Sequence, residues 1–402
     1  GAKRARNWSS VLSATCMHRC LPLRASMRIA LNARILQAPR TGIGHYVAEL
    51  VNALRNEPDV DVTLFHGWGW SSALPEAAIP GYSRLTPLLR QIPGAYQARR
   101  WLEQKRFDQG RAQGIDLYHE PSLWPLAFDG PTVITLHDLT HLHFPDTQPA
   151  ARLKEIERRL AAGVQQAQRI ITDSQAIADE AQAWFGLPAE RFVVAPLGVA
   201  ERFHPRQPDA IEAVLKAHAV AAREYFLCVG TLEPRKNLSL ALRAHALLPE
   251  AVRQRFPLLI VGMAGWQQAQ FSDELRKALA SGHVCLLGYL PDEQVAQLLA
   301  GARALVFPSR YEGFGLPVLE AMASGTPVIL TRSSAMPEVA GAAGNYIEPD
   351  DAHGLRDALN RLIDDQAHWQ ACREAGLHRT RLFSWERCAQ ATAGAYRQAM
   401  GG

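Results

Sequence analysis

Two glutamates, Glu312 and Glu320, are separated by seven residues in the segment E-G-F-G-L-P-V-L-E. Gly313 and Gly315 lie between them and allow a backbone to approach a ligand closely, because they carry no Cβ. The segment predicts a helix over about 316–323, and a helix start offers unpaired N–H groups to an anion. A carboxylate on each side of a bound phosphate suits the hydroxyls of a sugar. Either glutamate alone would more often be an ordinary surface residue, but the combination predicts a ligand site.

Two adjacent cations, Arg235 and Lys236, stand between a predicted strand over 225–230 and a predicted helix that begins at Leu238. Cations at the junction of a strand and a helix suit a diphosphate, because the helix start adds unpaired N–H groups. Charges that serve only solubility would be expected dispersed over the surface. We therefore predict that this segment contributes to an anion site.

A His-Asp pair, His137 and Asp138, directly follows a predicted strand over 133–136. Ligands of open α/β sheets bind at the carboxyl ends of the parallel strands, where this pair is expected. A single histidine is more often a satisfied core residue, but this position favours a role in the site.

Two further glycines, Gly42 and Gly44, stand in T-G-I-G-H-Y before a predicted helix that runs to about Leu54. They do not complete a dinucleotide fingerprint, because Val47 occupies the position of its third glycine. We predict a tight turn that can accommodate one phosphate or a sugar ring.

The longer segment E-G-F-G-L-P-V-L-E-A-M-A-S-G-T-P-V resembles the signature of the family 4 retaining glycosyltransferases, which have the GT-B fold. The resemblance covers nearly the whole chain from Met27. It implies that Glu312 and the backbone amides after it hold the donor sugar, and that Glu320 holds the nucleotide ribose. It also implies that His137 touches the donor sugar near its reacting carbon.

The same resemblance implies that Lys236 binds the donor diphosphate and that the turn at Gly42 lies beside the diphosphate and the acceptor. Thr231 replaces an arginine of the family, so either Arg235 takes over that task or one phosphate contact is missing. Gly262 and Gly265 are expected to turn beneath the nucleotide. The predicted site comprises the catalytic residues His137, Asp138 and Glu312, the diphosphate-binding residues Gly42, Gly44, Arg235, Lys236, Gly313, Phe314, Gly315 and Leu316, and the ribose- or base-binding residues Glu320, Gly262, Tyr289 and Leu290.

Strands alternate with helices through both halves of the chain, which predicts an α/β protein with two Rossmann-like parallel-sheet domains facing a cleft. We expect a leader outside the fold over 1–26, an acceptor domain over 27–205 and a nucleotide-sugar domain over 206–383. A last helix within 384–402 is expected to cross back onto the first domain, as the GT-B resemblance implies. The leader is interpreted as an upstream scar or an over-long start, with a transit peptide as the less favoured alternative.

The segment Asp59-Val60-Asp61 matches the D-x-D metal motif of the other, GT-A, glycosyltransferase fold, but such short patterns often arise by chance, and we interpret it as a turn. Fixed positive potential from Lys236 and the helix start after Gly315 can neutralise a leaving diphosphate. The resemblance implies front-face attack, in which a phosphate oxygen of the donor receives the acceptor proton. We therefore predict no metal and no cofactor, with the nucleotide sugar as co-substrate.

The formal net charge of +4 includes five basic residues and no acid within 1–26, so the remaining chain is close to neutral. This balance gives no argument for nucleic-acid binding. No apolar stretch is long enough to span a bilayer. Four scattered cysteines, Cys228, Cys285, Cys372 and Cys388, favour reduced thiols and a cytoplasmic location. A metal site formed by Cys16, His18 and Cys20 is only weakly supported.

The segment 82–111 is basic and amphipathic. It predicts either surface helices with an apolar face on the core, or a patch that rests on anionic lipid and admits a lipid-linked acceptor. The second interpretation places the protein peripherally on the inner face of the cytoplasmic membrane.

Four motifs, T-G-I-G-H-Y, T-L-H-D-L-T, G-T-L-E-P-R-K-N and F-S-W-E-R, resemble mannosyl- and rhamnosyltransferases of bacterial surface polysaccharide (O-antigen) synthesis. This resemblance implies a GDP-sugar donor and a polyprenyl-diphosphate-linked glycan acceptor. The alternatives are a UDP- or ADP-sugar glucosyltransferase, an epimerase or phosphorylase of the same fold, and a non-catalytic nucleotide-sugar-binding scaffold.

Overall fold

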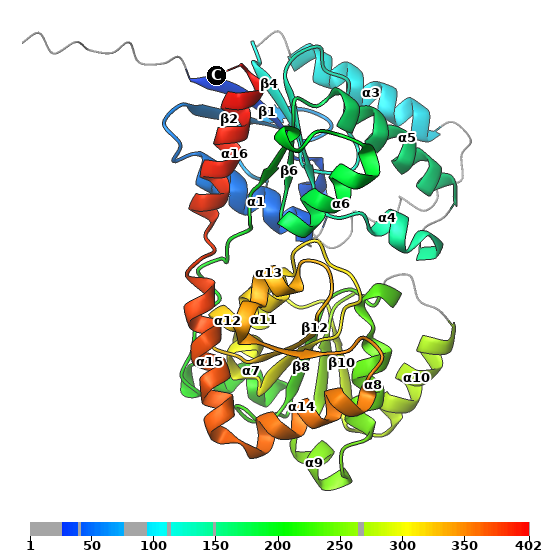
Figure 1. The fold of residues 1–402 in the computed structure, drawn as a ribbon, viewed down its shortest axis with the longest axis vertical. Helices are drawn as coiled ribbons and strands as arrows, with labels where there is room; N and C mark the ends of the chain where they lie inside the picture. Colours follow the sequence, from blue (N-terminus) through cyan, green and yellow to red (C-terminus); the bar gives the residue numbers. More distant parts are fainter. Residues whose placement is uncertain are drawn as a thin grey trace, which may run out of the picture.

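The computed structural model describes residues 26–38, 42–75, 95–110, 114–147, 150–263 and 269–401. These residues form two α/β domains, each built on one sheet (Figure 1). The leader 1–25 with its Cys16, His18 and Cys20, the part 82–94 of the basic segment, Arg111 and Gly265 lie outside the described residues. Within the described ranges, no helix is long and apolar enough to cross a membrane.

The first domain contains a seven-stranded sheet in the order β3-β2-β1-β4-β5-β6-β7. Neighbouring strands are parallel, except that the short β3 pairs antiparallel with β2. All side chains of the central strands β4 and β5 are buried, as expected for a parallel sheet covered by helices, although β4 includes the polar residues His119 and Glu120. The strands are β1 (Met27–Asn32), β2 (Val60–Phe65), β3 (Trp70–Ser71), β4 (Leu117–Glu120), β5 (Thr132–Leu136), β6 (Arg169–Thr172) and β7 (Phe192–Val194). The helices are α1 (Gly42–Leu54), α3 (Ala95–Gly110), α4 (Thr140–His143), α5 (Ala150–Gln166) and α6 (Gln175–Phe185).

The second domain contains a six-stranded, all-parallel sheet in the order β10-β9-β8-β11-β12-β13. The strands are β8 (Phe226–Val229), β9 (Leu258–Val261), β10 (Val284–Gly288), β11 (Ala304–Phe307), β12 (Val328–Thr331) and β13 (Gly344–Ile347). The helices are α7 (Glu212–Ala217), α8 (Leu238–Ala246), α9 (Glu250–Arg255), α10 (Ala269–Ala280), α11 (Asp292–Gly301), α12 (Leu316–Ala323), α13 (Met336–Ala340), α14 (Ala352–Asp364) and α15 (Gln366–Thr380), with a short 3-10 turn η6 (Pro234–Lys236) after β8.

The order of the second sheet reverses between β8 and β11, because β9 and β10 lie on one side of β8 and the later strands on the other. Loops that leave such a switch point in opposite directions open a crevice at the carboxyl ends of the strands. The loops after β8 and β11 carry η6 and the start of α12, the two segments singled out in the sequence. The predicted helix over 316–323 coincides with α12.

The last helix, α16 (Trp385–Ala399), returns to the first domain and packs against α1 and the strands β5, β6 and β7 (Figure 1). Ser384 caps the start of this helix, and its side chain accepts a hydrogen bond from Arg387 N. Asp59, in the turn before β2, forms an ion pair with Arg397 of this helix at 2.6 Å. The predicted fold, including the crossing helix, is therefore confirmed, and Asp59 serves as an anchor for that helix.

Two local predictions were wrong. The segment Asp59-Val60-Asp61 is not a turn throughout, since β2 begins at Val60 and only Asp59 precedes it. The glycines Gly42 and Gly44 do not form a turn ahead of the first helix, since α1 already begins at Gly42 and Gly44 is buried within it. Glycine costs a helix stability through its conformational freedom, by roughly 0.5–1 kcal/mol relative to alanine in the interior, so it is better tolerated at a helix start.

Candidate active site

A cavity of about 440 Å³ lies between the two domains and is lined by residues of both. Most residues singled out in the sequence line it: Gly42, His137, Asp138, Arg235, Lys236, Gly262, Tyr289, Leu290, Glu312, Gly313, Phe314, Gly315, Leu316 and Glu320. Gly44 is not among the lining residues, because it is buried in α1. The fold therefore brings together predicted residues that lie up to 278 positions apart in the sequence, from Gly42 to Glu320.

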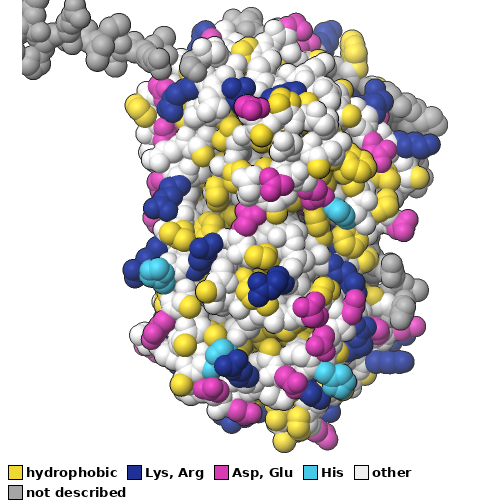
Figure 2. Space-filling view, in the orientation of Figure 1, with side chains coloured by type: hydrophobic (Ala, Val, Ile, Leu, Met, Phe, Trp, Pro, Cys, Tyr) yellow, Lys and Arg dark blue, Asp and Glu magenta, His cyan; other side chains and the backbone are white. Residues whose placement is uncertain are grey.

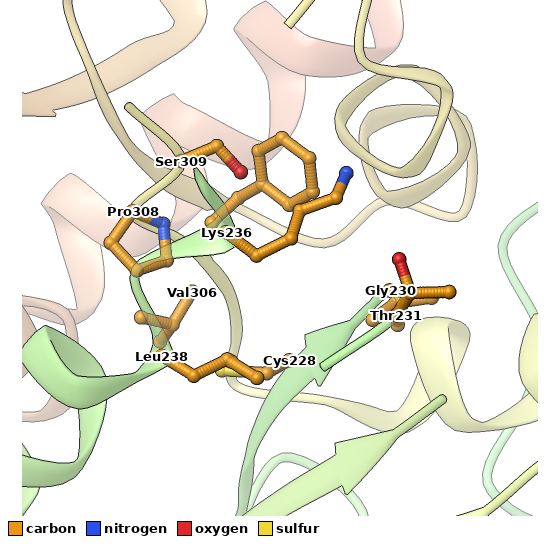
Figure 3. Close-up of a pocket in the computed structure, with 10 residues that line it drawn as sticks. Cys228, Gly230, Thr231, Lys236, Leu238, Val306, Pro308 and Ser309 are labelled. Atoms are coloured by element: carbon orange, nitrogen blue, oxygen red, sulfur yellow. The ribbon is translucent and has the colours of Figure 1, made fainter. Parts of the chain in front are cut away.

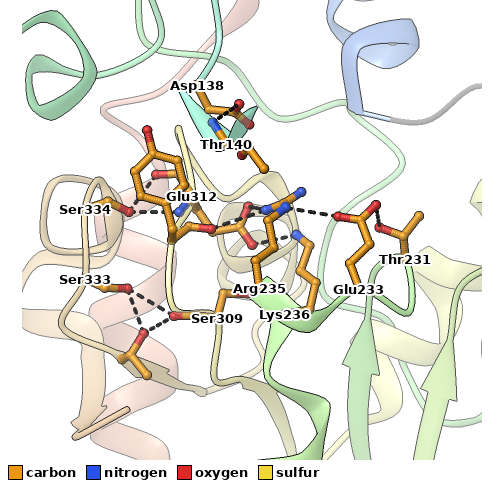
Figure 4. A network of polar contacts seen from close by, with 12 residues as sticks. Asp138, Thr140, Thr231, Glu233, Arg235, Lys236, Ser309, Glu312, Ser333 and Ser334 are labelled. Carbon is orange, nitrogen blue, oxygen red and sulfur yellow. Dashed lines mark hydrogen bonds and ion pairs between the residues drawn. The ribbon is translucent and has the colours of Figure 1, made fainter. Parts of the chain in front are cut away.

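Glu312 is the centre of a charged cluster at the start of α12. Its carboxylate accepts hydrogen bonds from Arg235 Nη1 at 2.8 Å and Lys236 Nζ at 2.6 Å (Figure 4). Burial alone would raise the pKa of Glu312, but the two cations outweigh it and lower the pKa to about 2. The carboxylate is therefore ionised, and it neutralises the cations expected to bind a diphosphate.

Arg235 is held on its other side by Glu233, whose carboxylate accepts from Arg235 Nε at 3.1 Å (Figure 4). The same carboxylate accepts from the hydroxyl of Thr231 at 3.0 Å. Thr231, at the position of the family arginine, thus helps to orient Glu233 and through it the guanidinium of Arg235. This arrangement places a cation in the cavity even though residue 231 is uncharged.

Lys236 reaches the cavity across a narrow crevice between the loops after β8 and β11. Figure 3 shows its side chain extended across this crevice, with the ammonium group away from Cys228 and Leu238. Its Nζ lies 4.9 Å from the ring centroid of Phe307. Burial lowers the pKa of Lys236, although Glu312 acts in the opposite direction. Its surroundings thus hold the ammonium group beside Gly230, at the carboxyl end of the central strand β8.

The two glycines around Phe314 are required by close packing. A Cβ on Gly313 would lie 1.8 Å from the carbonyl oxygen of His137, which belongs to the other domain. Gly315 has φ +99°, which side-chain-bearing residues rarely adopt, and a Cβ there would lie 2.4 Å from Met336 Cε. The loop before α12 therefore fits directly against the first domain.

His137 is oriented by a residue that the sequence analysis missed. Its Nδ1 lies 2.7 Å from Asp173 Oδ2, and its Nε2 lies 3.1 Å from the carbonyl oxygen of Pro121. Burial lowers the pKa of His137, but Asp173, Asp138 and the carbonyl of Pro121 together outweigh it, and the net shift is upward. Tyr46 packs edge-on against the imidazole at 4.6 Å between ring centroids. Asp173 follows β6 as His137 follows β5, so the ends of neighbouring parallel strands were the signal that could have identified it.

Glu320 differs from the ionised acceptor that the sequence analysis assumed. Burial raises the pKa of Glu320, and the negative charges of Asp292 and Glu49 raise it further. Arg202 acts in the opposite direction, but the resulting pKa is still about 8. The carboxyl group is therefore mostly protonated at neutral pH and can donate as well as accept a hydrogen bond. Arg202, from the segment between the domains, bridges Glu49 at 2.8 Å and Asp292 at 3.2 Å. These three charged residues line the same cavity and were also missed.

No group of three or more His, Cys, Asp or Glu side chains within the described ranges is arranged to hold a metal ion. Figure 2 shows basic and acidic side chains interspersed over the visible face of both domains, without a large area of one sign.

Two family models match this chain. "Glycosyltransferase Family 4" matches residues 40–203 and "Glycosyl transferases group 1" matches residues 212–379. O-antigen chain mannosyltransferase B of Escherichia coli is 33% identical over 379 residues, which cover 92% of this chain and 100% of the relative.

Solved structures resemble the fold over almost the whole chain. Sucrose-phosphate synthase from Thermosynechococcus elongatus aligns with a TM-score of 0.71 at 22% identity, covering 94% of this chain and 100% of that one. HepE of Anabaena, in complex with UDP-glucose, aligns with a TM-score of 0.69 at 19% identity, covering 92% and 100%.

Proposed function

Because this chain belongs to the family 4 glycosyltransferases, enzymes of the GT-B fold, we propose that it transfers mannose from GDP-mannose to an O-antigen glycan. The sugar and the pathway are supported by the E. coli relative, an O-antigen chain mannosyltransferase that aligns over its whole length. The observation that carries the proposal is the cluster of Glu312, Arg235 and Lys236 at the start of α12, inside a cavity between two domains.

In the proposed donor complex, the diphosphate competes with Glu312 for Arg235 and Lys236. Phosphate oxygens accept hydrogen bonds from both cations and from the backbone N–H groups at the start of α12. Glu312 then becomes available to accept hydrogen bonds from the hydroxyls of the donor sugar. The same cations stabilise the negative charge that develops on the leaving diphosphate, so no divalent ion is required.

We assign retention of the anomeric configuration to front-face attack. The carboxyl groups that line the cavity are engaged: Glu312 with two cations, Glu233 with Arg235, Asp173 with His137, Glu49 and Asp292 with Arg202, Asp138 with the N–H of Thr140, and Glu320 in its protonated form. None of these is arranged as the free nucleophile of a double displacement. The proton of the acceptor hydroxyl would instead pass to an oxygen of the departing diphosphate.

The proposed acceptor is a polyprenyl-diphosphate-linked glycan at an anionic membrane surface. Helix α3 buries Phe107 in the first domain but leaves Trp101 62% and Leu102 40% exposed, next to Lys105. Helix α3 is therefore a surface helix that packs on the core and also has an exposed apolar edge beside a cation. Such an edge suits the interface of an anionic bilayer.

A melting-temperature panel with GDP-, UDP-, ADP- and dTDP-sugars tests the donor, because a ligand selective for the folded state raises the melting temperature. GDP-mannose should give the largest shift, and NMR of the product should show the anomeric configuration of the donor. A shift with UDP-glucose and none with GDP-mannose would reject the proposed donor. UDP-glucose is the second candidate, because it is the ligand of the structurally similar HepE.

A further inference from the structure

A carboxylate of the second domain caps a helix of the first domain. Glu338, in α13, accepts hydrogen bonds from the backbone N–H of Gln175 at 2.7 Å and of Ala176 at 2.6 Å. These are the first two residues of α6, and the next N–H, that of Ile177, bonds to the side chain of Ser174 at 3.3 Å. A helix start needs acceptors for its first N–H groups and favours a negative charge. Glu338, from the other side of the cleft, thus accepts from two of these three N–H groups.

The start of α6 also contacts the loop before α12 directly. The hydroxyl of Ser174 donates to the carbonyl oxygen of Gly313 at 2.8 Å, and both groups are buried. Gly313 also lies so close to the His137 carbonyl that no Cβ would fit. The residue after Glu312 therefore contacts two segments of the first domain.

Tyr311, the residue before Glu312, is bound to the first domain as well. Its hydroxyl accepts from Leu139 N at 3.0 Å and donates to Glu180 of α6 at 2.9 Å. The short helix α13 is in turn fixed to its own domain, because Arg379 of α15 donates to the carbonyl oxygen of Val339 at 3.0 Å. Glu338 thus connects a rigid part of the second domain to the helix that holds the loop around Glu312.

The geometry points to Glu338 as a positioning residue for glycosyl transfer: its cap on α6 sets the separation of the domains at which residues 311–313 assemble against Ser174 and His137. This inference rests on the proposed role of Glu312 in holding the donor sugar. It predicts that loss of this contact lowers transfer but leaves nucleotide binding largely unchanged. The nucleotide contacts proposed for Gly262 and Tyr289 belong to the second domain, so they do not depend on this contact, whereas transfer does.

Two variants weaken the contact from its two sides. Glu338→Gln removes the charge from the acceptor, and Gln175→Pro removes one donor. Proline is suited to the first position of a helix, and Ser174 has the extended conformation, φ −148° and ψ 160°, that a following proline permits. Gln175→Pro should therefore keep α6 intact while deleting one of its two hydrogen bonds to Glu338. Glu374→Gln, an exposed change on α15, is the matched control.

The experiment measures, for each variant, kcat and KM of mannosyl transfer, the Kd of GDP by calorimetry, and the melting temperature. We expect both variants to lower kcat/KM about tenfold to a hundredfold, the range for losing hydrogen bonds to a charged group, with GDP affinity within about twofold of the parent. Small-angle scattering should show a larger radius of gyration, and Glu374→Gln should match the parent. Transfer at the parental rate in both variants would overturn the inference, as would a parallel fall in transfer, GDP affinity and melting temperature. Failure of the parent itself to bind GDP would instead refute the proposed donor.

Discussion

Replacing Glu312 by glutamine removes a negative charge from between two buried cations without changing the size of the side chain. Arg235 and Lys236, acting against burial, lower the pKa of Glu312 from 4.5 to about 2. One pKa unit corresponds to about 1.4 kcal/mol, so the ionised carboxylate contributes on the order of 3 kcal/mol to folding at neutral pH. In the variant, Arg235 and Lys236 lose the negative charge that balances them, and cations held away from water without such a charge destabilise the fold.

The pH dependence follows from the direction of the shift. A carboxyl group with a lowered pKa stabilises the fold above its unfolded value of 4.5, and this contribution is lost as the pH falls towards 2. Glu312→Gln should therefore be less stable than the parent by roughly 3 kcal/mol at about pH 7, with a difference that shrinks below about pH 4.5. Urea unfolding at a series of pH values measures this difference directly.

Glu320→Gln is the matched comparison, because the pKa of Glu320 is shifted in the opposite direction, to about 8. A carboxyl group with a raised pKa contributes stability that is fully present below its unfolded pKa and lost as the pH rises through the folded value. Glu320→Gln should therefore gain stability relative to the parent between about pH 5 and pH 9. Equal stability of Glu312→Gln and the parent at neutral pH, or the same pH trend in both variants, would refute the reasoning.

Four further predictions concern activity and membrane binding. Glu320→Ala should raise the KM for the donor more than it lowers kcat, whereas Glu312→Ala should abolish transfer; parental kinetics in either variant would contradict its proposed role. Lys236→Ala should lower kcat on the order of a hundredfold, the usual loss for one fixed donor at a developing anion, and an unchanged kcat would exclude this role. Transfer should persist in EDTA, and activity that is lost with chelator and restored by Mn²⁺ would count against a metal-free site. Trp101→Ser combined with Lys105→Glu should reduce pelleting with anionic vesicles at low salt, while transfer to a short soluble acceptor stays unchanged; no pelleting by the parent would remove the membrane proposal.

The local pattern of the sequence was sufficient for the elements around the site. The bounds of α12 follow from the glycines before it and from Gly325 and Pro327 after it, since these residues end helices through their own backbone geometry. Arg235 and Lys236 could be located for a similar reason, because a strand followed by a helix is visible in a short window of sequence.

What could not be predicted depends on contacts between distant segments. Glu338 and Gln175 are 163 residues apart, and nothing in the residues around either predicts that they meet. The protonation of Glu320 depends on Asp292 of its own domain and on Glu49 of the first domain, which reaches it only when the two domains face each other. Asp173 was missed because its partner His137 lies 36 positions away in the sequence, beyond any local pattern.

The return of α16 to the first domain determines the order in which this protein can be completed during synthesis. Trp385, Cys388, Ala389 and Tyr396 of this helix are buried against the domain that is translated first. That domain must therefore leave an apolar surface uncovered until α16 has left the ribosome. Because α16 follows the second domain in the sequence but covers the first, a fragment that ends between the two sheets would leave this apolar surface of the first domain exposed. A fragment that contains only the second half would expose the matching face of α16.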